Sequence, residues 1–209
     1  ESLLSKIQAL EFSSLIGTGG ALIELNYPLM CNGANLAFRK KAFYKVNGYK
    51  GFEDNSSGDD VFLMQKIHAL YKNSIAFQKD QRAIVYTSPQ PTVSDLVHQR
   101  KRWASKWNKY LPPLSWSLPV FLFVHYVSFL IGIIAIFLIP QMIWKVGLLI
   151  LIKIILDYFV LKKVMVFCKL QFEFWIFLLS EFLYPIYTLF IGISVHFGNY
   201  KWKGRLHKI

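Results

Sequence analysis

Residues 118–139 constrain the fold of this chain more than any other segment. They read LPVFLFVHYVSFLIGIIAIFLI and contain no charged side chain. A helix of about 20 apolar residues is long enough to cross the hydrocarbon core of a bilayer. The whole chain is 54% hydrophobic, above the roughly 45–50% of ordinary soluble domains. We therefore expect an integral membrane protein with a helical span over residues 118–139.

Two more apolar segments follow, at residues 142–161 and 172–197. In the first, Lys153 and Asp157 are spaced i, i+4 and can form an ion pair. The second contains Glu181, and an ionisable group inside a span costs roughly 2.5–3.5 kcal/mol on insertion scales. The basic tail after residue 197 favours an even number of crossings. We expect a membrane region of two to three segments. Either the third segment is a kinked or interfacial element, which is the interpretation we favour, or the second is not a full span.

The composition changes near residue 112. Residues 1–112 mix polar and apolar positions, whereas residues 113–209 hold the apolar segments and the tail. The chain begins at Glu1, and we expect it to be a fragment or a processed product. Its net charge of +12 suits phosphorylated or anionic partners, and the apolar runs favour nucleotide-sugars and lipid headgroups over nucleic acid. The two cysteines, one in each half, form neither a disulfide framework nor a metal site.

The first half shows helical and strand patterns in alternation. Periodicity predicts a helix over residues 2–16, a loop at 17–20, a short basic helix at 39–46 and a helix from about 58 to 71. Apolar runs between turn residues predict short strands at 29–38, 74–77 and 83–87. This order predicts an α/β domain.

Residues 92–109 are predicted to form one helix with a polar face. Thr92 and Asp95 have the spacing of an N-terminal cap. Four side chains at i, i+3, i+4 and i+7 share one side of this helix, namely Gln99, Arg102, Trp103 and Lys106. An amide, two cations and an indole suit a polyanion with a sugar ring beside it, such as a diphosphate-linked sugar.

Asp59 and Asp60 stand in the first turn of the helix predicted from residue 58. Acidic residues are common there because they complement the helix dipole. Successive helical residues point about 100° apart, so only one of the two carboxylates can face a cleft squarely. That carboxylate could act as a general base, which is typically worth ~10²–10⁴ in rate. Asn35, beside the Asn-Gly turn, could either cap the backbone or face a substrate.

Three motifs together resemble one family. They are CNGANLAFRKKAF at residues 31–43, SGDD at 57–60, and QRKRW at 99–103 ahead of the apolar segments. Over essentially the whole chain they resemble the C-terminal part of membrane-bound family 2 glycosyltransferases, such as cellulose, hyaluronan and ceramide-glucoside synthases. QRKRW matches the Q-x-x-R-W signature of these enzymes, and SGDD takes the place of their acidic T-E-D or E-D-D motif.

The resemblance implies the C-terminal half of a GT-A domain followed by membrane helices. It implies that Asp60 is the base that deprotonates the acceptor and that Asp59 supports it. It also implies that Gln99, Arg102 and Trp103 lie near the donor diphosphate and the acceptor. GT-A enzymes hold Mg²⁺ or Mn²⁺ with a D-x-D motif, which this chain lacks. We expect that metal in the full-length enzyme only, no metal ligand here, and an inactive fragment.

The leading hypothesis is inverting transfer of a sugar from a nucleotide-sugar to a lipid or saccharide hydroxyl. Residues 1–112 would then be cytoplasmic, on the cell (inner) membrane. The alternative is a non-enzymatic membrane protein whose basic soluble part binds anionic lipid or a partner. Nucleic-acid binding is not expected, because no nucleic-acid motif accompanies the basic residues. The motifs do not specify the donor sugar or the acceptor.

Overall fold

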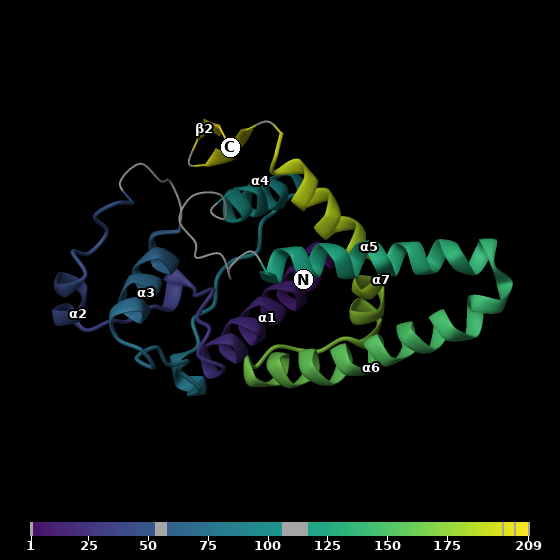
Figure 1. The fold of residues 1–209 in the computed structure, drawn as a ribbon, viewed down its shortest axis with the longest axis horizontal. Helices are drawn as coiled ribbons and strands as arrows, with labels where there is room; N and C mark the ends of the chain where they lie inside the picture. Colours follow the sequence, from purple (N-terminus) through teal and green to yellow (C-terminus); the bar gives the residue numbers. More distant parts are fainter. Residues whose placement is uncertain (1, 53–57, 106–116, 198, 203, 209) are drawn as a thin grey trace.

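The computed structural model describes residues 2–52, 58–105, 117–197, 199–202 and 204–208. Helix α1 (Leu3–Glu24) runs through the middle of the molecule, and the other elements surround it (Figure 1). The hydroxyl of Ser2 caps its first turn by accepting a hydrogen bond from the Ser5 N–H at 3.2 Å. This helix confirms the helical prediction for residues 2–16.

The loop predicted at residues 17–20 is wrong, because α1 continues through the GTGG sequence to Glu24. The reason is a close approach between two helices. A Cβ atom on Gly17 would lie 2.8 Å from a methyl group of Val164. Glycine here allows α1 to pack against α6, and that packing stabilises a helix which the local propensity of glycine disfavours.

The strands predicted at 29–38, 74–77 and 83–87 are wrong as well. These segments are extended or irregular and contain two short 3₁₀ turns, η1 (Gly33–Asn35) and η2 (Gln81–Ala83). A strand needs a neighbour for its backbone groups, and side chains take that role here. The Asn35 side-chain amide, for example, donates to the Ala83 carbonyl at 2.7 Å. The α/β class is not confirmed within the described residues.

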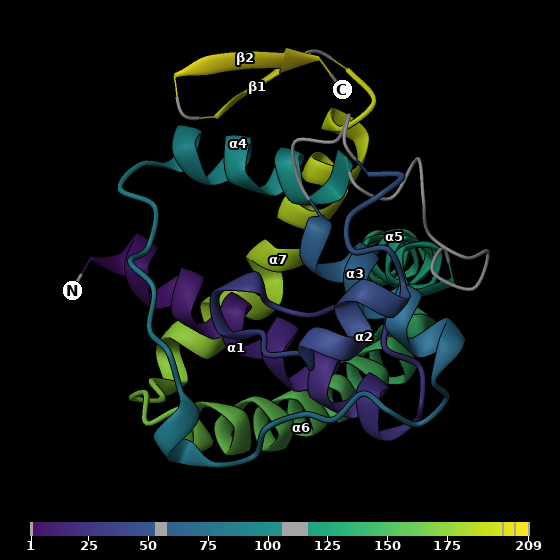
Figure 2. The same cartoon turned by 90° about the vertical axis from the view of Figure 1, so that its left-hand side faces the viewer.

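The described strands are β1 (Asn199–Trp202) and β2 (Arg205–Lys208), which form an antiparallel hairpin in the tail. This hairpin lies over helix α4 (Val93–Ala104), as Figure 2 shows. The Lys201 N–H donates to Nδ1 of His98 at 3.3 Å. Helix α4 is thus held between the hairpin and the rest of the molecule.

Helices α2 (Lys40–Lys45), α3 (Asp59–Leu70) and α4 confirm the predictions for residues 39–46, 58–71 and the start of 92–109. Thr92 caps α4 as predicted, accepting from the Asp95 N–H. Helices α2 and α3 enclose a small core of Val46, Leu63 and Ile67. The domain boundary predicted at residue 112 lies outside the described residues.

Three long helices follow: α5 (Ser117–Leu138), α6 (Ile143–Phe167) and α7 (Phe174–Ser194). The turn η5 (Pro140–Met142) joins α5 to α6, and these two helices project to one side as a hairpin (Figure 1). Helix α7 runs back towards α4 and the tail (Figure 2). A second core, formed by Leu10, Met165 and Phe177, joins α1 to α6 and α7.

Among the described helices, α5 and α7 are long and apolar enough to cross a membrane. This agrees with the alternative in which the second segment, now α6, is not a full span, whereas the favoured interpretation of the third segment, now α7, as a kinked or interfacial element is not confirmed. The difference between α6 and α7 has a clear cause. Lys153 of α6 pairs with Asp157 at 2.8 Å, as predicted, and also contacts the buried carboxylate of Glu181. This cation lowers the cost of keeping Glu181 inside α7, while α6 carries the excess of charged side chains.

The contact between Gly17 and Val164 generates a prediction. Gly17→Leu should force α1 away from α6 and lower the free energy of unfolding by about 1–3 kcal/mol, as overpacking usually does. Gly147→Leu is the matched control, because a Cβ atom at Gly147 meets no atom within 4 Å. Thermal unfolding of the detergent-solubilised protein measures both variants. Equal melting temperatures for the two would contradict the packing described here.

Candidate active site between α1, α3 and α4

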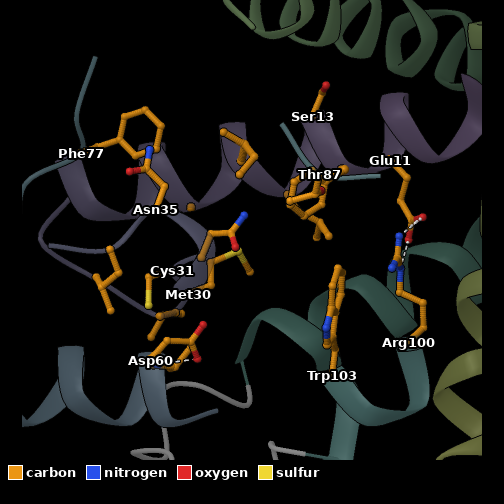
Figure 3. Close-up of a pocket in the computed structure, with 18 of the residues that line it drawn as sticks. Glu11, Ser13, Met30, Cys31, Asn35, Asp60, Phe77, Thr87, Arg100 and Trp103 are labelled. Carbon is orange, nitrogen blue, oxygen red and sulfur yellow. Dashed lines mark hydrogen bonds and ion pairs between the residues drawn. The ribbon is translucent and has the colours of Figure 1, made fainter. Parts of the chain in front are cut away.

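A large hollow of about 2600 Å³ lies at the centre of the molecule. Its walls come from α1, α3, α4 and the extended segments around residues 29–38 and 74–90. Four of the residues that the sequence singled out line it, namely Asn35, Asp60, Gln99 and Trp103. Figure 3 shows Asp60 and Trp103 on the same side of the hollow, projecting from α3 and α4. Residues far apart in the sequence therefore share one cavity.

Asp60 is held in place by backbone N–H groups. Its Oδ2 accepts from the Gly33 N–H at 2.9 Å, and its Oδ1 accepts from the Val61 N–H at 2.8 Å. A Cβ atom on Gly33 would lie 3.2 Å from Oδ2, so glycine allows this close approach. The contact joins the CNGAN segment to the acidic motif. Charge-assisted hydrogen bonds of this kind fix the orientation of a carboxylate.

The neighbouring carboxylate behaves differently. Asp59 is exposed and is not among the residues that line the hollow. This arrangement agrees with the 100° separation of successive helical residues, which lets one of the two carboxylates face a cleft. Asp59 can therefore influence a molecule bound in the hollow only through the charge of its carboxylate.

Asn35 lines the hollow but is engaged with the backbone. Its side-chain amide donates to the Ala83 carbonyl at 2.7 Å, which ties η1 to η2. Of the two roles left open by the sequence, this contact favours the structural one. Asn35 holds two segments of the wall together.

Only part of the predicted polar face of α4 lines the hollow. Gln99 and Trp103 line the hollow, whereas Arg102 does not and Lys106 lies outside the described residues. Arg102 is half-buried on the flank of the helix. Burial lowers the pKa of its guanidinium from the ordinary value, and the nearby Tyr200, Asp60 and Asp59 oppose that shift. Arg102 therefore lies within electrostatic range of the two carboxylates and keeps its charge.

Two important residues were not identified from the sequence. Arg100 donates to both carboxylate oxygens of Glu11, from Nε to Oε1 at 2.9 Å and from Nη2 to Oε2 at 2.7 Å. Its guanidinium also lies over the ring of Trp103, 4.2 Å from the centroid. Both charged side chains are buried, with 8% and 7% of their surface exposed. The available hint was an acidic residue, Glu11, in the apolar pattern of residues 2–16.

The buried position of this ion pair changes the pKa of the Arg100 guanidinium. Burial alone would lower the pKa of the Arg100 guanidinium, but the hydrogen bonds and the charge of Glu11 raise that pKa above its ordinary value. Arg100 is therefore fixed as a cation next to the indole ring of Trp103.

The described residues do not fit a metal ion. No group of three or more His, Cys, Asp or Glu side chains among them lies close enough to hold one. The Mg²⁺ or Mn²⁺ expected for the full-length enzyme remains a prediction about a motif that this chain lacks.

Comparison with models of protein families gives a match. The model of the family described as glycosyl transferase family group 2 matches residues 1–195, which include the residues that line the hollow except His196 and Phe197. No curated protein and no solved structure matches the chain.

The bond from Asn35 to the Ala83 carbonyl can be tested by substitution. Asn35→Ala should lower the free energy of unfolding by about 1 kcal/mol, the usual net value of one hydrogen bond. Asn35→Asp should lower it further, because a carboxylate would face the carbonyl oxygen. Chemical unfolding followed by circular dichroism measures both. Unchanged stability in both variants would contradict the structural role and would favour the alternative in which Asn35 faces a substrate.

Proposed function

We propose, from the premise that the chain belongs to glycosyl transferase family group 2, that it forms the acceptor-side part of an inverting, membrane-bound sugar transferase. Membership of the family implies a sugar donor and an acceptor. The donor in this proposal is a nucleotide-sugar, and the acceptor is a hydroxyl of a lipid or a saccharide. The observation that carries the proposal is the position of Asp60, fixed by backbone N–H groups in the same hollow as Gln99 and Trp103.

In this scheme, Asp60 accepts the proton of the acceptor hydroxyl. A carboxylate has about four lone-pair positions, so it can accept a hydrogen bond from the incoming hydroxyl while the two backbone N–H bonds stay in place. The acceptor oxygen forms a bond to the anomeric carbon, and the bond from that carbon to the diphosphate oxygen breaks. Attack opposite the leaving group inverts the configuration at that carbon. A fixed base removes the need to reorganise during the reaction.

Helix α4 would bind the sugar and the leaving diphosphate. The indole of Trp103 offers an apolar face to a sugar ring. The amide oxygen of Gln99 contacts the Arg100 guanidinium, which leaves its N–H donors for substrate hydroxyl or phosphate oxygens. Arg102 would add positive charge near the diphosphate as negative charge develops on it. Lys106 belongs to the same proposal from its place in the sequence.

The candidate membrane helices favour a lipid over a saccharide as the acceptor. Leu122 and Phe123, in the first turns of α5, line the same hollow as Asp60. An apolar wall that continues into a candidate span would give a lipid chain access to the base. Two or three segments favour single transfer or short assembly over a polymer channel. We place the protein in the cell (inner) membrane with residues 1–112 on the cytoplasmic side.

The base role of Asp60 is tested by Asp60→Asn in the natural full-length enzyme. Removing a general base should reduce the turnover number about 10²–10⁴-fold with little change in expression. Asp95→Asn is the matched control, because Asp95 also stands in the first turn of a helix but does not line the hollow. A screen of nucleotide-sugars in detergent, with extracted membrane lipids as acceptors, provides the activity. Near-normal transfer by Asp60→Asn would remove Asp60 from the base role, whereas the absence of transfer by the wild-type enzyme with every donor and acceptor would favour the non-enzymatic alternative.

A second substitution tests the diphosphate-binding role of α4. Arg102→Ala should weaken the binding of a nucleoside diphosphate about tenfold or more, since a charge-assisted hydrogen bond contributes roughly 1.5–3 kcal/mol. Arg102→Lys should recover part of the affinity, because it keeps the charge without the planar fork. Isothermal titration of the full-length protein measures both. Equal affinities for wild type and Arg102→Ala would count against this role.

A further inference from the structure

We propose that Glu11 is a positioning residue: through Arg100 it fixes the indole of Trp103 in the hollow. This inference rests on the proposed function, because it treats Trp103 as part of a sugar-binding surface. It adds a first-helix residue to the site, and neither residue of the pair belongs to the Q-x-x-R-W signature positions.

The pair has the geometry of a fixed clamp. Arg100 uses two different nitrogens on the two oxygens of Glu11, so the guanidinium plane cannot rotate without breaking a bond. Both side chains are buried, and water cannot replace either bond at low cost. The plane of the guanidinium is therefore set from α1, although Arg100 itself belongs to α4.

The orientation of the Arg100 guanidinium plane in turn fixes the position of the Trp103 indole. The Arg100 guanidinium carbon lies 4.2 Å from the centroid of the indole ring, within the range of a cation–π contact. Phe12, the residue after Glu11, contacts the same indole, with ring centroids 6.1 Å apart and planes tilted by 38°. Two consecutive residues of α1 thus set the position of the indole, one directly and one through Arg100. Figure 3 shows the Glu11–Arg100 pair beside Trp103 at the edge of the hollow.

A buried ion pair is weak evidence for stability, because apolar side chains of similar size often hold two helices together equally well. What the ion pair adds is orientation. An apolar contact between α1 and α4 would leave the guanidinium and the indole free to adopt other rotamers. This is why we assign Glu11 a positioning role in addition to a packing role.

The clamp also contacts α7. The Tyr187 hydroxyl lies 3.4 Å from Oε1 of Glu11, the same oxygen that accepts from Nε of Arg100. Helix α7 is one of the two candidate spans. A displacement of α7 would therefore act on Glu11, and through Arg100 on Trp103.

The test follows the indole directly, without relying on catalysis. The full-length protein is labelled with 5-fluorotryptophan and studied in detergent by ¹⁹F NMR. The Trp103 resonance is identified by its loss in Trp103→Phe. Glu11→Gln keeps the size of the side chain but removes the charge, and it should shift or broaden the Trp103 resonance. Glu24→Gln is the matched control on the same helix, because Glu24 forms an exposed ion pair with Lys79 at 2.8 Å. It should leave the resonance unchanged.

Arg100→Lys provides a second variant in which the total charge is kept. Lysine lacks the planar fork that binds both oxygens of Glu11, so the Trp103 resonance should move here too. Misplacement of a binding group by about 1 Å can cost 10²-fold in rate. We therefore expect transfer by Glu11→Gln and Arg100→Lys to fall about ten- to hundredfold, largely through a higher KM, with Glu24→Gln at the wild-type level.

A Trp103 resonance unchanged in either Glu11→Gln or Arg100→Lys would overturn the positioning role. So would a loss of transfer that appears only in kcat with KM and the resonance unaltered. Failure of the proposed function would look different. In that case Asp60→Asn would retain its activity, while the Trp103 resonance would still respond to Glu11→Gln.

Discussion

The ion pair between Glu11 and Arg100 is the interaction on which the described arrangement depends most. It joins the first helix to α4 across 89 positions of the chain and sets how far apart these two walls of the hollow stand. Breaking a buried pair by removing one partner usually costs about 3–5 kcal/mol, because the remaining charge stays unpaired. Both the walls and the Trp103 indole therefore depend on one pair of side chains.

A second constraint brings the remaining motif to the same place. The Gly33 N–H and the Asp60 carboxylate join the turn after Cys31 to the start of α3. Asp60 thereby faces the same hollow as Gln99 and Trp103, although 39 positions separate the first two of these residues. The three sequence motifs thus converge through contacts that are individually small. The Arg102 guanidinium adds its charge from the flank, outside the lining.

The helices of this fold could be predicted because their signals are local. The Thr92–Asp95 cap and the acidic first turn of α3 lie within four residues of the helix starts that they determine. The strands could not be predicted correctly, because a strand depends on a partner that its own residues do not reveal. The loop predicted at GTGG was wrong for a related reason. Gly17 is helical because α1 packs closely against Val164, which lies far along the chain in α6. The burial of Arg100 likewise depends on Glu11, which is distant in the sequence. Arg102 and Trp103 were therefore assigned to the site from the sequence, whereas Arg100, which orients the indole, was not identified.

The central claim is that one hollow between α1, α3 and α4 holds both the leaving diphosphate and the acceptor. The most direct measurement is a cryo-electron microscopy structure of the full-length protein with uridine or guanosine diphosphate bound. The account predicts diphosphate density in the hollow against Gln99 and Trp103 of α4, close to the flank that carries Arg102, with Asp60 facing the space next to it. Density on another surface, with Asp60 turned away from it, would contradict the account.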